Sequence, residues 1–186
     1  AHDAALTGLM ERLAARQPSD DLSDGELAAE VEPSAQKDRR VLKLVIDTNL
    51  WLRTLMGGPN SLFLLQAWQS RQYVPVVSAD LLDELQEVSS RPRLRGRINQ
   101  EDVALLIGEL RQFGMFVVPV TVPPMCRDPK DHPVLAAAID GHAEAIVTGD
   151  ADLRADSRLR DEMAEYGVAL WGIETLRARL AAQTLE

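Results

Sequence analysis

The sequence predicts an α/β fold in which helices cover the faces of a mainly parallel sheet of about five strands. Short apolar runs alternate with longer helical segments along most of the chain, as expected when each strand is followed by a helix. Aromatic residues make up only 4% of the 186 residues, and the apolar residues are mainly Leu, Val, Ala and Ile. That composition favours helices on a buried parallel sheet over a β-sandwich. Two of the strand-like runs are also followed by an aspartate, at the sheet edge where α/β folds bind ligands.

The first 40 residues are interpreted as an acidic extension, helical or flexible, that precedes a domain of residues 41–186. Four apolar residues on one helical face predict a short amphipathic helix: Leu6, Leu9, Met10 and Leu13. A second helical patch is expected at residues 25–31, and a polar linker at residues 33–40. The extension either docks on the domain and shields a basic loop, as a tethered inhibitor, or is flexible or dimer-forming. We favour the second interpretation.

Strands are expected where short apolar or β-branched runs are bounded by turn-forming residues. These runs are residues 41–46, 73–77, 115–118, 145–147 and 168–170. Helices are expected at residues 61–70, 79–90, 99–113, 133–142 and 173–182, with a polar helical stretch after residue 150. Ser78 is placed to cap the second of these helices, and Pro92 is expected to end it, so that an arginine-rich loop follows.

The net charge of −9 is concentrated near the N-terminus. Residues 1–38 carry nine acidic and three basic side chains, a net of −6, which leaves −3 for the other 148 residues. The domain is therefore close to neutral once bound cations offset its acids, and a nucleic-acid partner is not excluded. Cys126 is the only cysteine, which excludes an intramolecular disulfide and a cysteine-based zinc site. With no long apolar run and no signal-peptide pattern, we expect a cytoplasmic protein without a membrane partner.

Four acidic side chains are placed to meet at one edge of the predicted sheet. Asp47 directly follows the first strand, Asp150 stands just past the strand at residues 145–147, and Asp131 begins the helix that leads into that strand. Glu84 lies in the helix after the strand at residues 73–77. Carboxylates gathered in a poorly solvated cleft repel one another and need cations. A set without Cys or paired His selects Mg²⁺ or Mn²⁺ over zinc, and such ions suit phosphate chemistry.

Each acid also has an ordinary structural interpretation. Asp47 can cap a helix or form a turn, and Asp131 can favour a helix N-terminus. Glu84 can be a solvated surface residue. Asp150 can form an Asx-turn, with Asp152 completing an acidic loop. The functional interpretation depends on the four acids together.

Four motif blocks around these acids resemble, in order, those of PIN-domain nucleases. The blocks are VIDTNL at residues 45–50, SADLLDEL at 78–85, RDPKD at 127–131 and IVTGDADL at 146–153. The third and fourth blocks are similar to those of PIN proteins that act as toxins of toxin–antitoxin pairs. The resemblance spans about residues 41–180. Position 132 is His, where similar proteins often carry a small acid or amide, and the first 40 residues have no counterpart in the usual compact domain.

This resemblance implies a Rossmann-like three-layer fold and a Mg²⁺- or Mn²⁺-dependent endoribonuclease that hydrolyses RNA phosphodiester bonds. The metal-binding and catalytic residues that it implies are Asp47, Glu84, Asp131 and Asp150. The supporting polar residues that it implies are Thr48, Asn49, Thr148 and Asp152. RNA is the implied substrate, and a cognate antitoxin and a homodimer are typical of the family.

One concentrated basic segment follows the helix that carries Glu84. Its arginines are Arg91, Arg93, Arg95 and Arg97. They either hold the RNA backbone beside the cleft or pair with surface acids. Further basic candidates near the motif acids are Arg53, Arg127 and Lys130, and the three tryptophans, Trp51, Trp68 and Trp171, are expected in the core.

Functions of other classes compete with the nuclease interpretation. A PIN-like module that binds a partner or RNA and cuts nothing is disfavoured because all four acids are present. A phosphotransferase with Asp47 as covalent nucleophile is disfavoured because the residue two positions later is Asn49, not an acid. A DNA nuclease of similar fold stays open, since the same ions would cut either polymer.

Overall fold

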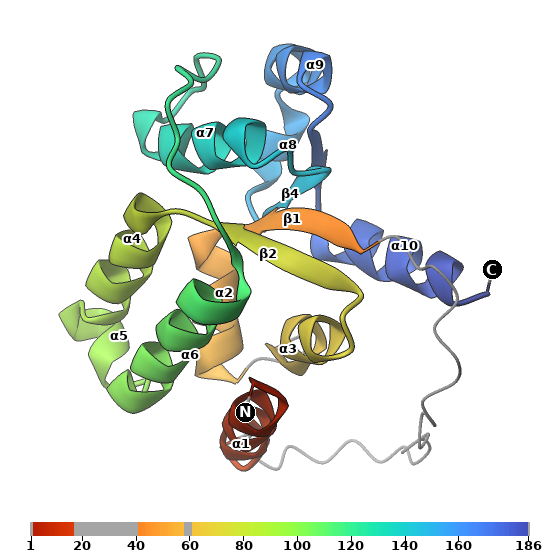
Figure 1. Ribbon diagram of the computed structural model, residues 1–186. Coiled ribbons are helices and arrows are strands. Elements are labelled where there is room, and N and C mark those ends of the chain that lie inside the picture. The colour runs from red at the N-terminus through yellow and green to blue at the C-terminus, as the bar shows by residue number, and fades with distance from the viewer. Residues whose placement is uncertain (1, 17–40, 58–60, 186) are drawn as a thin grey trace.

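The centre of the molecule is a five-stranded sheet in which all strands are parallel and the order is β3-β2-β1-β4-β5. The computed structural model describes residues 2–16, 41–57 and 61–185. The strands are β1 (Leu42–Ile46), β2 (Tyr73–Val77), β3 (Met115–Phe116), β4 (Ala145–Val147) and β5 (Ala169–Trp171). The predicted α/β fold with a parallel sheet is confirmed (Figure 1). The expected helical patch at residues 25–31 and linker at residues 33–40 lie outside the described residues, and the domain boundary at residue 40 stays a prediction.

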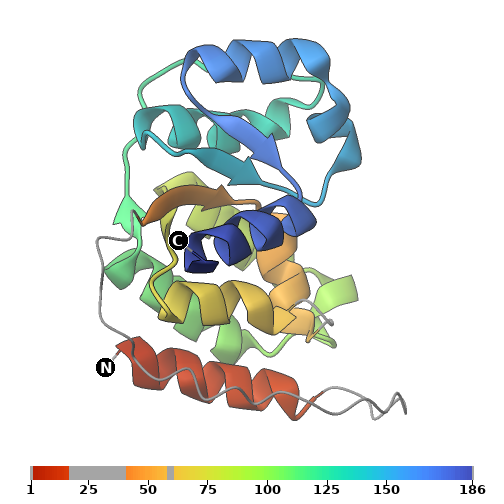
Figure 2. The ribbon, with the colours of Figure 1, turned by 90° about the vertical axis from the view of Figure 1, so that its right-hand side faces the viewer.

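Helices cover both faces of this sheet and make three layers (Figures 1 and 2). One face packs against α2 (Thr48–Met56), α3 (Ser61–Gln69), α4 (Ala79–Ser89), α6 (Gln100–Phe113) and α10 (Ile173–Leu185). The other packs against α7 (His132–Asp140), α8 (Ala151–Ala155) and α9 (Ser157–Glu165). Side chains alternate between these faces along a strand: Leu44 and Ile46 join the first apolar cluster, and Val45 between them joins the second. Both faces of the central strands are thus buried, which explains their continuous apolar runs.

Local sequence signals set most helix boundaries. Ser78 caps α4 by accepting from the Leu81 N–H, as predicted, and Asn99 caps α6 by accepting from the Glu101 N–H at 2.7 Å. Four expectations were wrong in detail. Helix α2 was not predicted, and Pro92 opens the one-turn helix α5 (Pro92–Arg95) where a loop was expected, because proline suits a first helical turn. Strand β3 ends two residues early, and β5 is shifted by one residue, to Ala169–Trp171.

The N-terminal helix α1 (His2–Ala14) is docked on the domain and contacts α3 and α6. Its apolar face carries Leu6, Leu9 and Leu13, each 0% exposed, which belong to the same apolar cluster as the sheet. Figure 2 shows α1 beyond α3 and α6, on their side away from the sheet. Between docking and a flexible or dimer-forming extension, residues 2–14 therefore follow the first interpretation. Inhibition by this helix stays a hypothesis.

The tryptophans serve the core, as expected. Trp51 and Trp68 are each 3% exposed and their rings lie 6.3 Å apart, and Trp171 is 8% exposed. Among the described helices, none is long and apolar enough to cross a membrane.

Candidate active site

The candidate site lies where the chain reverses its direction of travel across the sheet. After β1 the chain adds β2 and β3 on one side, and then returns to add β4 and β5 on the other. The carboxyl ends of β1 and β4 therefore flank a topological switch point, the usual ligand site of such sheets. Asp47 directly follows β1, and its N–H donates to the Val147 carbonyl of β4 at 2.9 Å. Asp150 follows β4, so these two acids share one edge as predicted.

A buried threonine connects the two aspartates. Thr148 is 0% exposed; its hydroxyl donates to Asp47 Oδ2 at 2.6 Å and accepts from the Asp150 N–H at 3.0 Å. Asp47 also caps α2 through the N–H of Asn49, and Asp150 Oδ1 caps α8 through the N–H of Asp152 at 2.8 Å. The ordinary capping roles are thus real. They leave Asp150 Oδ2 without a hydrogen bond from any described residue, so capping and ligand binding are compatible.

Glu84 differs from the other acids of α4 in its burial and in its hydrogen bond to Thr48. Its Oε2 accepts a hydrogen bond of 2.8 Å from the hydroxyl of Thr48, which is only 5% exposed. Glu84 itself is half-buried, whereas Asp80 and Asp83 on the same helix are exposed. Thr48 directly follows Asp47, so this bond joins α4 to the carboxyl end of β1.

Asp131 has the most perturbed carboxyl group of the site. It is half-buried at the end of the short 3₁₀ helix η1 (Pro129–Asp131), and its side chain makes no capping hydrogen bond to α7. Burial first, and then the repulsion of nearby carboxylates, raises its pKa from 3.8 to about 6. The repelling carboxylates are Asp47, Asp128, Asp150 and Glu84. The other three predicted acids therefore all lie close enough to Asp131 to repel its charge.

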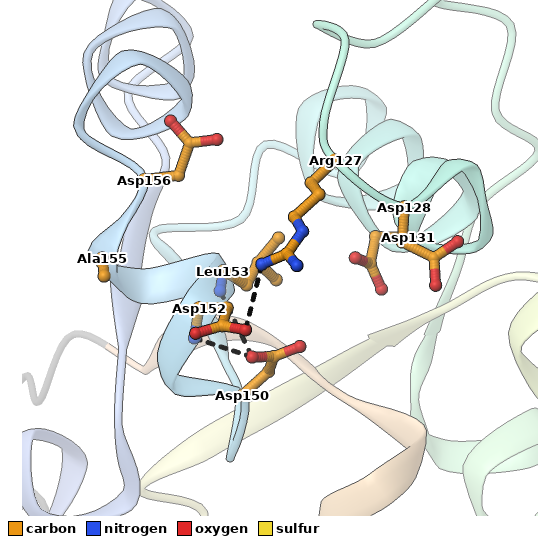
Figure 3. A pocket seen from close by; sticks show the side chains of 8 residues that line it. All are labelled: Arg127, Asp128, Asp131, Asp150, Asp152, Leu153, Ala155 and Asp156. Carbon is orange, nitrogen blue, oxygen red and sulfur yellow. Dashed lines mark hydrogen bonds and ion pairs between the residues drawn. The ribbon is translucent and has the colours of Figure 1, made fainter.

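A pocket of about 640 Å³ opens beside these acids (Figure 3). Its lining residues are Arg127, Asp128, Asp131, Asp150, Asp152, Leu153, Ala155 and Asp156. Arg127 reaches from the Asp128 side of the pocket to the carboxylate of Asp152, at 3.2 Å, as Figure 3 shows. Both partners are exposed, so this pair is weak. Asp152 therefore has a cationic partner that Asp131 lacks within the described residues.

Two pocket acids were not among the predicted site residues. Asp128 stands in the RDPKD block and caps η1 through the Lys130 N–H at 3.0 Å. Asp156 caps α9 through the Leu159 N–H at 3.0 Å. The motif spacing could have indicated Asp128, whereas no local signal distinguishes Asp156 from an ordinary cap. His132 begins α7, half-buried, and its Nε2 is buried without a hydrogen-bond partner within the described chain.

The basic side chains divide into paired and unpaired groups. Arg91 pairs with Glu87 at 3.0 Å, whereas Arg93, Arg95 and Arg97 are exposed and form no ion pair with described residues. Arg53 is exposed and lies against the turn between β4 and Asp150: a methyl group added at Gly149 would be 3.5 Å from its Nη1.

The donor chemistry of the site fits a hard divalent cation. Its donors are carboxylate oxygens, and their repulsion at Asp131 is what a bound cation would relieve. Within the described part of the chain, no three Asp, Glu, His or Cys side chains stand close enough to hold one ion together. The carboxylates thus share an electrostatic field without forming a closed ligand shell.

Comparison with known protein families identifies a match to this chain. A family model described as PIN domain matches residues 43–152, more than half of the chain, and this range contains all four acids. The search of curated proteins and the search of solved structures each found no match.

Proposed function

The chain belongs to the PIN-domain family, whose members are generally nucleases, and we propose that it is a divalent-metal-dependent endoribonuclease. The metal-binding and catalytic groups of this proposal are the carboxylates of Asp47, Glu84, Asp131 and Asp150. The observation that carries the proposal is the convergence of these acids at one edge of the sheet: the Thr148 hydroxyl bridges Asp47 and Asp150, and burial, followed by repulsion from Asp47, Asp128, Asp150 and Glu84, raises the pKa of Asp131 to about 6.

Each part of the site has a distinct task in the proposed reaction. The hydroxyls of Thr148 and Thr48 hold the carboxylates of Asp47 and Glu84 in place. Asp131 has no capping bond, so its carboxylate is free to turn toward a cation. Bound Mg²⁺ or Mn²⁺ would polarise a phosphate oxygen and lower the pKa of an attacking water. Asn49 and Asp152 complete the polar surroundings of the site.

RNA binding is assigned to arginines that form no ion pair with described residues. Arg93, Arg95 and Arg97 project from α5 and the residues after it, and their charge is available to phosphates because no described acid pairs with them. Arg91 contributes less, since Glu87 shares its charge. Arg53, which lies against Gly149 in the turn before Asp150 and forms no ion pair with described residues, is a further candidate.

A toxin role in a toxin–antitoxin pair, with a cognate antitoxin and a homodimer, is the finer form of this proposal. Its support is the resemblance of the RDPKD and IVTGDADL blocks to those of such toxins. The alternative is a catalytically silent PIN module that binds RNA or a partner.

Replacing Asp47 by Asn tests the proposed activity. The amide retains an oxygen for the Thr148 hydroxyl but loses the charge, so we expect a folded protein whose cleavage falls by at least about 100-fold. The measurement is cleavage of end-labelled single-stranded RNA with Mg²⁺, Mn²⁺ or EDTA. Asp83→Asn is the matched control: it removes an exposed acid next to Glu84 and should cut as well as the unaltered protein.

The outcomes separate the candidate functions. Cleavage by the unaltered protein that EDTA stops and Asp47→Asn removes supports the metal-dependent nuclease. Undiminished metal-dependent cleavage by Asp47→Asn contradicts the proposed site. RNA binding without cleavage, with either ion, supports the silent module.

A further inference from the structure

A single arginine stands among the aspartates of the pocket beside the site. Of the described residues that line this pocket, five are aspartates and Arg127 is the only basic one. Figure 3 shows its side chain extending between Asp131 on one side and Asp152 on the other. The pocket has a volume of about 640 Å³, which is room for a phosphate group beside the guanidinium.

The contact that holds Arg127 in this position is weak. Its Nη1 donates to Asp152 Oδ2 at 3.2 Å, and the side chains of Arg127 and Asp152 are 83 and 77% exposed. An ion pair this exposed contributes little to stability, because water screens it and both side chains lose rotamer freedom. The fold therefore loses little when Arg127 exchanges Asp152 for another partner.

Most of the guanidinium of Arg127 is available to such a partner. The bond to Asp152 uses one N–H group, and the side chain forms no other hydrogen bond or ion pair within the described parts of the chain. A guanidinium presents its N–H groups as a planar fork that fits two oxygens of a phosphate at once. A phosphate therefore offers Arg127 more hydrogen bonds than Asp152 does.

The charges in the pocket give this exchange its direction. A phosphate that enters among aspartates is repelled by them and attracted by a cation, and Arg127 is the cation that the pocket already contains. The same positive charge opposes the binding of a metal cation beside Asp152 for as long as Arg127 stays there. Arg127 thus favours a phosphate and disfavours a metal ion.

We propose that Arg127 binds a phosphate of the RNA substrate in this pocket and leaves Asp152 to do so. This role rests on the proposed function, which supplies RNA as the substrate. Without RNA, Arg127 pairs with Asp152. When RNA binds, the guanidinium turns to the phosphate, and the carboxylate of Asp152 is released next to Asp150, whose Oδ1 accepts from the Asp152 N–H.

Binding of RNA to the full chain in EDTA tests this exchange without any cleavage. The probe is a fluorescently labelled single-stranded RNA, and its anisotropy is measured at several salt concentrations. Arg127→Gln removes the phosphate contact, so we expect the Kd to rise about 5–10-fold. The slope of the logarithm of the binding constant against the logarithm of the salt concentration should become shallower by about one.

Two further variants distinguish phosphate binding from a structural role of the ion pair. Arg127→Lys keeps the charge and should recover most of the RNA affinity. Asp152→Asn breaks the same pair but releases Arg127 and removes a repelling charge, so it should lower the Kd for RNA by at least about 2-fold. If the pair only stabilised the fold, Arg127→Gln and Asp152→Asn would both weaken RNA binding.

Titration with Mn²⁺ in the absence of RNA gives a second readout. Arg127→Gln removes a positive charge from the pocket, so the affinity for Mn²⁺ should rise about 2–5-fold while the affinity for RNA falls. Arg158→Gln is the matched control, since it removes an arginine from an exposed ion pair outside the pocket lining. We expect it to change either affinity by less than about 2-fold.

Equal RNA affinity of Arg127→Gln and the unaltered protein would overturn this role of Arg127. A joint loss of RNA and Mn²⁺ affinity in Arg127→Gln, or an equal loss of RNA affinity in Arg158→Gln, would overturn it as well. A protein that binds RNA through Arg127 but does not cut it supports the exchange and contradicts the proposed nuclease. A protein that binds no RNA overturns both.

Discussion

Two buried or half-buried carboxylates of this protein stand in opposite electrostatic surroundings. Asp102 in α6 is 0% exposed, and two arginines pair with it, Arg12 of α1 at 2.8 Å and Arg16 of the turn after α1 at 2.6 Å. Asp131 is less buried, yet no described cation pairs with it, and its neighbours are other carboxylates. A carboxylate that serves the fold is neutralised when the chain folds. Carboxylates without a cationic partner at a strand-end cleft agree instead with the proposed cation-binding role.

The largest expected effect comes from removing the neutralising charge at Asp102. In Arg12→Gln with Arg16→Gln, the buried carboxylate keeps its charge and loses both cationic partners. Breaking a buried pair from one side costs about 3–5 kcal/mol, and the partial exposure of both arginines reduces this to about 2–3 kcal/mol. Urea unfolding at neutral pH measures the loss. Arg158→Gln, which breaks only an exposed pair on α9, should cost less than about 0.5 kcal/mol.

An additional Asp102→Asn substitution sharpens this result. It removes the stranded charge, so the triple variant should recover part of the lost stability. A double arginine variant that is no less stable than Arg158→Gln would contradict the structural role assigned to Asp102.

A smaller effect is expected at Arg53, a cation beside the acidic site that pairs with none of its carboxylates. If Arg53 binds an RNA phosphate, Arg53→Gln should raise KM about 3–10-fold with little change in kcat. The slope of the logarithm of the RNA-binding constant against the logarithm of the salt concentration should become shallower by about one. Arg53→Lys keeps the charge and should retain most of the affinity. Equal KM and salt slope in Arg53→Gln and the unaltered enzyme would exclude Arg53 from RNA binding.

The smallest expected effect is a gain of stability at Asp131. Its pKa of about 6 in the folded protein lies above the ordinary 3.8, so the folded state binds this proton more tightly than the unfolded chain. Ionisation of Asp131 therefore lowers stability as pH rises between these values, and the full cost is present above pH 6. Because Asp131 is partly exposed, solvent screening reduces the destabilisation by its charge to about 1 kcal/mol. Asp131→Asn removes this destabilisation and should raise the Tm of the metal-free protein by about 2–4 °C at pH 7.5.

Thermal unfolding in EDTA at several pH values checks this gain. The difference should shrink as pH is lowered toward 4, where folded Asp131 is already protonated. Mn²⁺ should raise the Tm of the unaltered protein and not that of Asp131→Asn. A lower Tm for Asp131→Asn at pH 7.5 would show that the carboxylate stabilises the fold after all.

Local patterns predicted the strands that place the site. The runs before Asp47 and Asp150 are apolar on both faces and end at polar residues, so β1 was located to within one residue and β4 at its observed bounds. Ser78 and Asn99 are short polar residues before helical periods, and their capping bonds are local. Helix α2 was missed because only Asp47 separates it from β1. The apolar residues of β1 and α2 therefore showed no clear boundary between strand and helix. Strand β3 was predicted two residues too long, because exposed and buried valines at the edge of a sheet have the same β-strand propensity.

The sequence by itself determined the fold class, the order of the strands along the chain and the identity of the candidate carboxylates, since these follow from local periodicity and motif spacing. Tertiary structure decided which acids act together. It distinguished Glu84 from Asp83 through the Thr48 hydroxyl, and it brought Arg12 and Arg16 to Asp102. It also left large apolar side chains exposed in the segment after β3, from Phe116 to Met125. Burial and neutralisation depend on residues far apart in the chain, so no local pattern records them.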